Sequence, residues 1–464
     1  MPRHRARLPL APAVALAFAA AAAALLTSCA LPPQSLRVPV VLRQVPFTPD
    51  SGTLGVRCGR LIDGVGATAR RNTLVIIRDG RIVSLTDDAG KQAAANALVP
   101  ILDLSDYTCL PGLIDMHTHL TDRPEDTSDL TVLFKRSDEE TMRLGKENAA
   151  ATVLAGFTGA RNVGTYVMGT DYALRDEIDK GRAIGPRIQA SGPYLTIEHG
   201  GGDLYVPGFK EPPDSARFHA GVAHDPDEFR ARAQDLVNAG SDLLKVIASG
   251  AVLAFDSEPG APEMTQEDIA AVVEVAHASG RKVAAHAHGE KSILMAIAAG
   301  ADTIEHASYL GDAGIAAALK RGNVAFSMDV YNGDYIDTEG RRQHWPEEFL
   351  RKNVETTEIQ RQAFTKAVKA GVPIVFGTDS AVYPHGLNAR QFPIMVQRGM
   401  TPMQAIKAAT SVAAHYMGWD ADIGSLEPKK FGDLIAVKKD PLADISALQD
   451  VAVVIKGGLP LKLP

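Results

Sequence analysis

A unit made of a helical stretch, a glycine and a short apolar strand recurs through the middle of the chain. Its copies are LAGFTGARNVG, NAGSDLLKVIASG, ASGRKVAAHAHG, AAGADTIEHAS, KRGNVAFSMDV and KAGVPIVFGTDS. The glycine suits the left-handed residue just past a helix C-terminus, and a helix between successive strands implies parallel strands. With LIDMHTHL and PRIQASGPYLT the copies make eight strands. This pattern predicts an α/β fold, a (β/α)8 TIM barrel over residues 111–417.

A doubly wound open sheet is the alternative for this region. It is disfavoured because no glycine-rich phosphate-binding fingerprint follows the first strand, LIDMHTHL.

Strand-like segments at both ends of the chain predict a second, smaller unit. Residues 51–110 and 418–464 show alternating apolar residues and DG or GG turns, as in NTLVIIRDGRIVSL and VAVVIKGGLPLKL. We expect them to form one small β-sandwich domain. Cys58 and Cys109 both lie in the first segment, and either a disulfide or two buried free thiols fits the sequence.

The first residues of the chain have the pattern of an export signal. Residues 1–29 combine a basic start, an alanine-rich apolar run and the sequence LTSC, which resembles a bacterial lipobox. We expect lipidation of Cys29, residues 30–50 as a tether, and an exported lipoprotein that faces the periplasm, on the outer membrane because Ala30 follows the cysteine. Membrane contact would come only through this anchor. An ordinary signal peptide cleaved nearby is the alternative.

The overall charge argues against nucleic acid as a partner. The 464 residues carry a formal net charge of −7 and show no long basic run after the N-terminus. Proteins that bind nucleic acid usually present a basic face. We therefore expect a small-molecule ligand.

Polar side chains stand at the ends of five of the predicted barrel strands. They are His117, His119, Lys245, His286, His288, His306 and Asp379. The carboxyl ends of barrel strands meet at one mouth, where active sites lie. Imidazoles and a carboxylate are ligands that zinc prefers. The sequence therefore predicts a metal centre at this mouth.

The motifs that carry these residues resemble those of the amidohydrolase superfamily. The resemblance runs from GRLIDG through LPGLIDMHTHL, LLKVIASG, VAAHAHG, TIEHAS and FGTDS to IGSLEPKKFGDLIAV. It is strongest to the branch of Xaa-Pro dipeptidase-like and imidazolonepropionase-like proteins, which includes metal-dependent carboxypeptidases and ochratoxinase-type amidases. The chain departs from the family where Gly432 and Asp433 replace the usual AD, in the outer domain.

The resemblance implies a ligand set and roles. His117, His119 and Asp379 would hold one divalent ion, expected to be Zn²⁺. His286 and His306 would hold a second, and a CO2-derived carbamate on Lys245 would bridge the two. Asp379 would act as general base and then general acid, and His288 would bind the substrate carbonyl or developing oxyanion, or else orient a ligand.

The substrate is less constrained by the sequence. Arg161, Tyr331, His385 and Arg390 are candidates to bind a substrate carboxylate, and each could equally be a solvated loop residue. The resemblance implies a binuclear zinc amidohydrolase that releases a C-terminal amino acid from dipeptides or N-acyl amino acids, including ochratoxin A. It also implies a homo-oligomer, as is common in the family.

Three alternative functions are weighed. A cyclic-amide hydrolase of the imidazolonepropionase type is the first. A deaminase is disfavoured by Lys245 and because Gly289, not glutamate, stands three residues after His286. A lipoprotein that binds metal without turnover is disfavoured because Asp379 is present.

Overall fold

The structure, a computed structural model, describes residues 52–90 and 99–464. The expected signal peptide (1–29), the lipidated Cys29 and the tether (30–50) lie outside the described residues. Within the described ranges, no helix is both long and apolar enough to cross a membrane.

Eight parallel strands follow one another along the middle of the chain. Three form one sheet: β5 (Leu113–Thr118), β6 (Phe157–Asn162) and β7 (Arg187–Ala190). Five form another: β8 (Leu243–Ile247), β9 (Lys282–Ala287), β10 (Thr303–His306), β11 (Ala325–Ser327) and β12 (Ile374–Val375). The sheets are linked by parallel bridges from Leu195 to Val246 and from Thr118 to Ser380. The predicted α/β class and the parallel pairing are confirmed.

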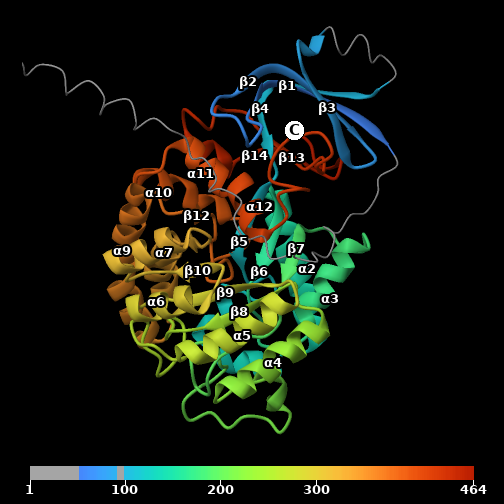
Figure 1. Ribbon diagram of the computed structural model, residues 1–464. Helices are drawn as coiled ribbons and strands as arrows, with labels where there is room; N and C mark the ends of the chain where they lie inside the picture. Colours follow the sequence, from blue (N-terminus) through green and yellow to red (C-terminus); the bar gives the residue numbers. More distant parts are fainter. Residues whose placement is uncertain (1–51, 91–98) are drawn as a thin grey trace, which may run out of the picture. The chain divides into compact units, whose positions relative to one another are not determined.

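Helices connect successive strands. Between strands run α2 (Asp138–Leu154), α3 (Thr170–Asp179), α4 (Pro226–Ala239), α5 (Gln266–Ala278), α6 (Glu290–Ala299), α7 (Asp312–Arg321), α8 (Asn332–Tyr335) and α9 (Glu347–Ala370). After β12 come α10 (Gln391–Gln397), α11 (Pro402–Ala408) and α12 (Ser411–Met417). Figure 1 shows α6, α7 and α9 on the outer side of β9 and β10. The glycines of the repeated unit have positive φ, as predicted for residues that end helices: Gly156, Gly240, Gly280, Gly300, Gly322 and Gly371.

One seven-stranded sheet joins the two ends of the described chain. Its order is β15-β14-β13-β4-β1-β2-β3. The strands are β1 (Thr53–Leu61), β2 (Arg70–Arg78), β3 (Arg81–Asp87), β4 (Ile101–Pro111), β13 (Leu434–Val437), β14 (Val451–Lys456) and β15 (Leu459–Lys462). The described strands from both ends of the chain share a single sheet, so the second sheet of the expected β-sandwich stays a prediction. The expected limits of the domains also stay a prediction.

Cys58 on β1 and Cys109 on β4 form a disulfide, with 5.9 Å between their Cα atoms. The alternative of two free thiols is therefore wrong. The two cysteines lie on neighbouring parallel strands, and the register of β1 against β4 shifts between Cys58 and Arg60.

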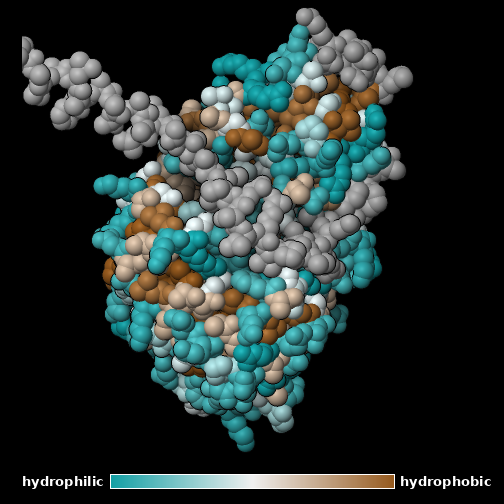
Figure 2. Space-filling view, viewed as in Figure 1, coloured by the Kyte–Doolittle hydropathy of each residue, from teal (hydrophilic) through white to brown (hydrophobic). Residues whose placement is uncertain are grey.

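The visible face of the molecule is largely polar, with separate apolar patches (Figure 2). The large apolar side chains exposed on α7 and α9 are Leu319, Val354 and Ile359. The buried apolar residues between strands and helices form the main core.

Candidate active site

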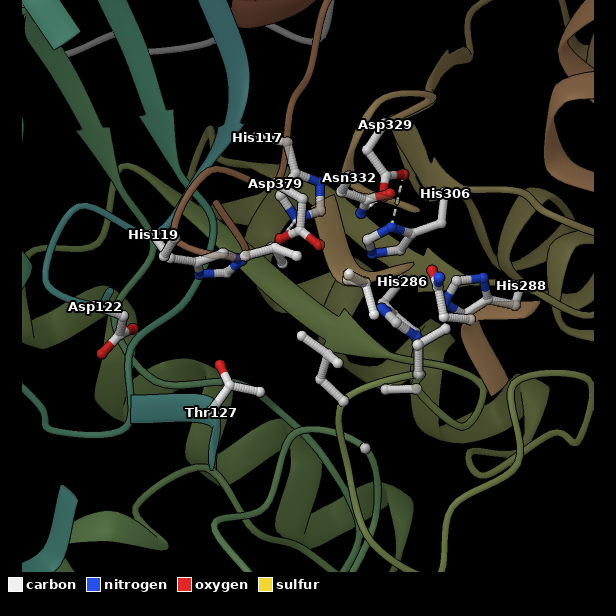
Figure 3. Close-up of a pocket in the computed structure, with 18 of the residues that line it drawn as sticks. His117, His119, Asp122, Thr127, His286, His288, His306, Asp329, Asn332 and Asp379 are labelled. Carbon is white, nitrogen blue, oxygen red and sulfur yellow. Dashed lines mark hydrogen bonds and ion pairs between the residues drawn. The ribbon is translucent and has the colours of Figure 1, made fainter. Parts of the chain in front are cut away.

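A pocket opens where the parallel strands end, and the predicted metal-binding side chains line it (Figure 3). His117 lies on β5, with His119 just after it, and Lys245 lies on β8. His286 lies on β9, followed by His288, and His306 ends β10. Asp379 follows β12. The histidines and Lys245 are buried, and the Asp379 side chain is 15% exposed.

The histidines and Asp379 are close enough to share metal ions. Nε2 of His117 and Nε2 of His119 lie 3.4 and 3.1 Å from Oδ1 of Asp379. Two sets of three have potential ligand atoms within 4.8 Å of one another: His117, His306 and Asp379, and His286, His288 and His306. Because His306 belongs to both sets, the two candidate positions adjoin.

Lys245 extends into this pocket with its amine unpaired. Among the described residues its Nζ is buried and has no hydrogen-bond partner. Burial lowers the pKa of Lys245 to about 8, against the opposing effect of Glu305 and Asp379. A buried ammonium without a hydrogen-bond partner is costly, so burial shifts this amine toward its neutral form.

A buried chain of charged groups orients His117. Its Nδ1 lies 2.8 Å from Oε2 of Glu305, and Nη2 of Arg161 donates to Oε1 of Glu305 at 2.6 Å. Arg161 Nε donates to the carbonyl of Met116 at 2.6 Å. Burial lowers the pKa of His117 to about 3. His117 therefore donates from Nδ1 to Glu305 and presents an unprotonated Nε2 to the pocket.

The other histidines are held in the same way. Nδ1 of His306 lies 2.9 Å from Oδ1 of Asp329, which also accepts from Nε2 of Gln360 at 2.8 Å. Nδ1 of His288 lies 2.7 Å from Oγ of Ser308. His286 uses the opposite nitrogen, with Nε2 3.0 Å from the carbonyl of Gly250. In each ring the second nitrogen is left for the pocket.

Left-handed backbone marks two of these positions. His306 has φ +66° and Asp379 has φ +57°. Non-glycine residues seldom adopt this conformation, and it clusters at functional sites where the fold imposes it.

Two of the predicted substrate residues do not line the pocket in the structure. Arg161 lies within β6 with its guanidinium committed to Glu305 and Met116, and it is 1% exposed. His385 is also buried, with Nε2 3.2 Å from the carbonyl of His119 and Nδ1 3.3 Å from Oγ of Ser380. Neither side chain lines the pocket.

The other two predicted substrate residues pair with each other. Nη1 of Arg390 donates to the Tyr331 hydroxyl at 2.8 Å, outside the pocket lining. The pocket instead contains side chains that the sequence analysis did not single out: Asp122, Arg123, Asp126, Tyr166 and Tyr194. They come from loops after β5, β6 and β7, where no periodic pattern marks a residue that faces a pocket.

The chain is similar in sequence and fold to several known proteins. A model of the amidohydrolase family matches residues 108–460. The chain is 29% identical to ochratoxinase of Aspergillus niger over 435 residues, 88% of this chain and 86% of that protein. It is 24% identical to imidazolonepropionase of Symbiobacterium thermophilum over 394 residues, 77% of this chain and 82% of that protein. The crystal structure of an Xaa-Pro dipeptidase with methionine bound in its active site has a TM-score of 0.81 and 32% identity, covering 89% of this chain and 100% of that one.

Proposed function

The chain belongs to the amidohydrolase family and is a hydrolase of amide bonds, and from this premise we propose that it is a binuclear zinc enzyme that releases C-terminal amino acids. The observation that carries the proposal is the single pocket that contains the histidines, Asp379 and the unpaired amine of Lys245. In this proposal the eight parallel strands form the (β/α)8 barrel of the family, with the pocket at its mouth.

The residues present fit two metal ions. We assign His117, His119 and Asp379 to one ion and His286 and His306 to the other, with a carbamate on Lys245 between them. The donor set of imidazoles and carboxylates suits zinc. A carbamate would give the buried Nζ of Lys245 the partners that it lacks among the described residues. When bound, two such ions supply Lewis-acid polarisation of a carbonyl and a nucleophile from water at neutral pH.

The protein's own groups then move the proton and hold the substrate. Asp379 accepts the proton of the attacking water and delivers it to the leaving amine. His288 donates from Nε2 to the substrate carbonyl oxygen, because Ser308 occupies its Nδ1. Arg123, the arginine among the pocket residues, is placed to bind the carboxylate of the leaving amino acid; its Nε donates to Asp126, and 45% of its side chain is exposed.

The relatives indicate the substrate class. The names ochratoxinase and Xaa-Pro dipeptidase denote hydrolysis of an amide to an amino acid, and the dipeptidase structure holds methionine in its active site. Amino-acid release from a panel of dipeptides, N-acyl amino acids and ochratoxin A tests the proposal. Release from any of the panel supports it. No release by a protein with two bound metal ions would instead favour a cyclic-amide hydrolase, in keeping with the similarity to imidazolonepropionase.

Removal of metal is expected to abolish activity. Treatment with a chelator followed by dialysis should reduce amino-acid release to background, and zinc with bicarbonate should restore it, because both the Lewis acid and the carbamate must be replaced. Elemental analysis of the active protein should give two equivalents of metal. One equivalent at full activity would contradict the binuclear site.

Glu305→Gln is expected to weaken metal binding by about 10- to 100-fold, as loss of a group that orients a histidine ligand does. The amide accepts more weakly from His117 and leaves the buried Arg161 without its counter-ion. Competition with a chromogenic chelator measures the affinity. Glu263→Gln is the matched control: Glu263 accepts from Ser257 and from Gly201 N and bonds to none of the histidines, so its replacement should leave the affinity unchanged. Equal affinities for both variants would overturn the role of Glu305.

We also propose export as a lipoprotein and assembly of identical subunits. The Cys58–Cys109 disulfide supports an oxidising compartment.

A further inference from the structure

The pocket wall beside His119 carries a carboxylate that no described residue pairs with. Asp122 lines the pocket, and no described residue forms a hydrogen bond or salt bridge with its carboxylate. Burial raises the pKa of this carboxyl to about 6, against the opposing charges of His119 and Arg136. Its backbone N–H donates to the carbonyl of His119 at 3.0 Å, which fixes it one turn beyond this histidine. Figure 3 shows Asp122 and Thr127 on the same side of the pocket as His119.

The two nearby arginines bond to a different carboxylate. Asp126 pairs with Arg136 and accepts from Nε of Arg123 at 3.0 Å. Neither arginine bonds to Asp122, which leaves Asp122 as the carboxylate available to a positively charged ligand on this wall.

Two phenol rings line the pocket together with this carboxylate. Tyr166 and Tyr194 line the pocket with ring centroids 5.3 Å apart, and the Tyr194 hydroxyl lies 3.0 Å from Nδ1 of His119. Burial raises the pKa of both tyrosines, and the negative charge of Asp122, which lines the same pocket, adds to the shift in each case. A carboxylate beside aromatic rings is the combination that binds organic cations, through charge pairing and through the electron-rich ring faces.

From this arrangement we infer that Asp122, Tyr166 and Tyr194 form a subsite for a positively charged nitrogen of the substrate. The inference rests on the proposed amidase function and narrows it to substrates that carry an ammonium. The free amino group of an unblocked dipeptide is one source, since it lies two bonds from the scissile carbonyl, and Asp122 lines the same pocket as the residues proposed to act on this carbonyl. A basic side chain is the other source.

Binding of three phosphinic dipeptide analogues tests the inference, measured by calorimetry with the zinc-loaded protein. The first has a free amino terminus, the second is N-acetylated, and the third is N-acetylated but carries a lysine side chain. We expect the wild type to bind the first about tenfold more tightly than the second, roughly what one charge-assisted hydrogen bond contributes. Asp122→Asn should remove this difference and leave the affinity for the acetylated analogue unchanged.

Asp129→Asn is the matched control. Asp129 lies in the same loop, is exposed, and accepts from the backbone of Thr131 outside the pocket, so its replacement should preserve the tenfold preference. A preference that depends on Asp122 only for the lysine analogue would support the subsite with a side-chain cation as its ligand. Equal binding of all three analogues, or a preference that survives Asp122→Asn, would overturn the subsite alone. Failure of every analogue to bind would contradict the amidase proposal and the subsite with it.

Discussion

Lys245→Ala is expected to lower kcat/KM for amide hydrolysis by about a thousandfold, which corresponds to about 4 kcal/mol of transition-state stabilisation. The Nζ of Lys245 is buried in the pocket with the histidines and Asp379 around it, and it is unpaired among the described residues. If its carbamate holds both metal ions, alanine removes a ligand from each at once. Kinetics on the best substrate of the panel and elemental analysis of the same sample measure the two effects.

Rescue by a small carboxylate separates this role from a loss of fold. Acetate or propionate has the planar anionic end of a carbamate and should restore part of the activity of the alanine variant. Lys456→Ala is the control, because Lys456 is a half-buried lysine that donates to the carbonyl of Gly185 and does not line the pocket. It should lower the melting temperature and leave kcat/KM within about twofold, since it touches no reacting group. Full activity of the Lys245 variant would refute the bridging role.

The strand ends could be predicted from the sequence because they follow from local patterns. A glycine that ends a helix and a short apolar run after it locate each strand, and parallel pairing then brings His117, Lys245, His286 and Asp379 to one pocket. The repeated unit can be recognised in the sequence because the end of each helix depends on a local backbone conformation that glycine favours.

The substrate residues could not be predicted in this way. Arg161 stands in GARNVG, one residue before the end of β6, and whether it faces the pocket or Glu305 depends on the partner strand. The wall with Asp122 depends on the pairing of Asp126 with Arg136 across ten residues of irregular chain. The disulfide joins two cysteines that are 51 residues apart in the sequence, and it likewise depends on the register of β1 against β4. Contacts of this kind are tertiary and leave no periodic pattern.

Asp379→Asn is expected to lower kcat by about 10³-fold, within the range for loss of a general acid–base group. The amide keeps an oxygen near Nε2 of His117 and His119 but cannot accept a proton from water at neutral pH. Metal content should therefore fall less than activity. Both are measured on one preparation, with kcat determined at saturating substrate so that weaker binding does not contribute.

Substrates with different leaving groups distinguish the two proton transfers proposed for Asp379. If it only accepts the proton of water, the loss in Asp379→Asn should be the same for an amino-acid amide bond and for an ester of the same acyl group. If it also protonates the departing amine, the ester should lose less, because an alcohol leaves with less need of an acid. If the Asp379→Asn variant retained its metal and hydrolysed amides at the wild-type rate, the acid–base role would belong to another group. His288 is the candidate, because Ser308 holds its Nδ1 and its Nε2 remains for the substrate.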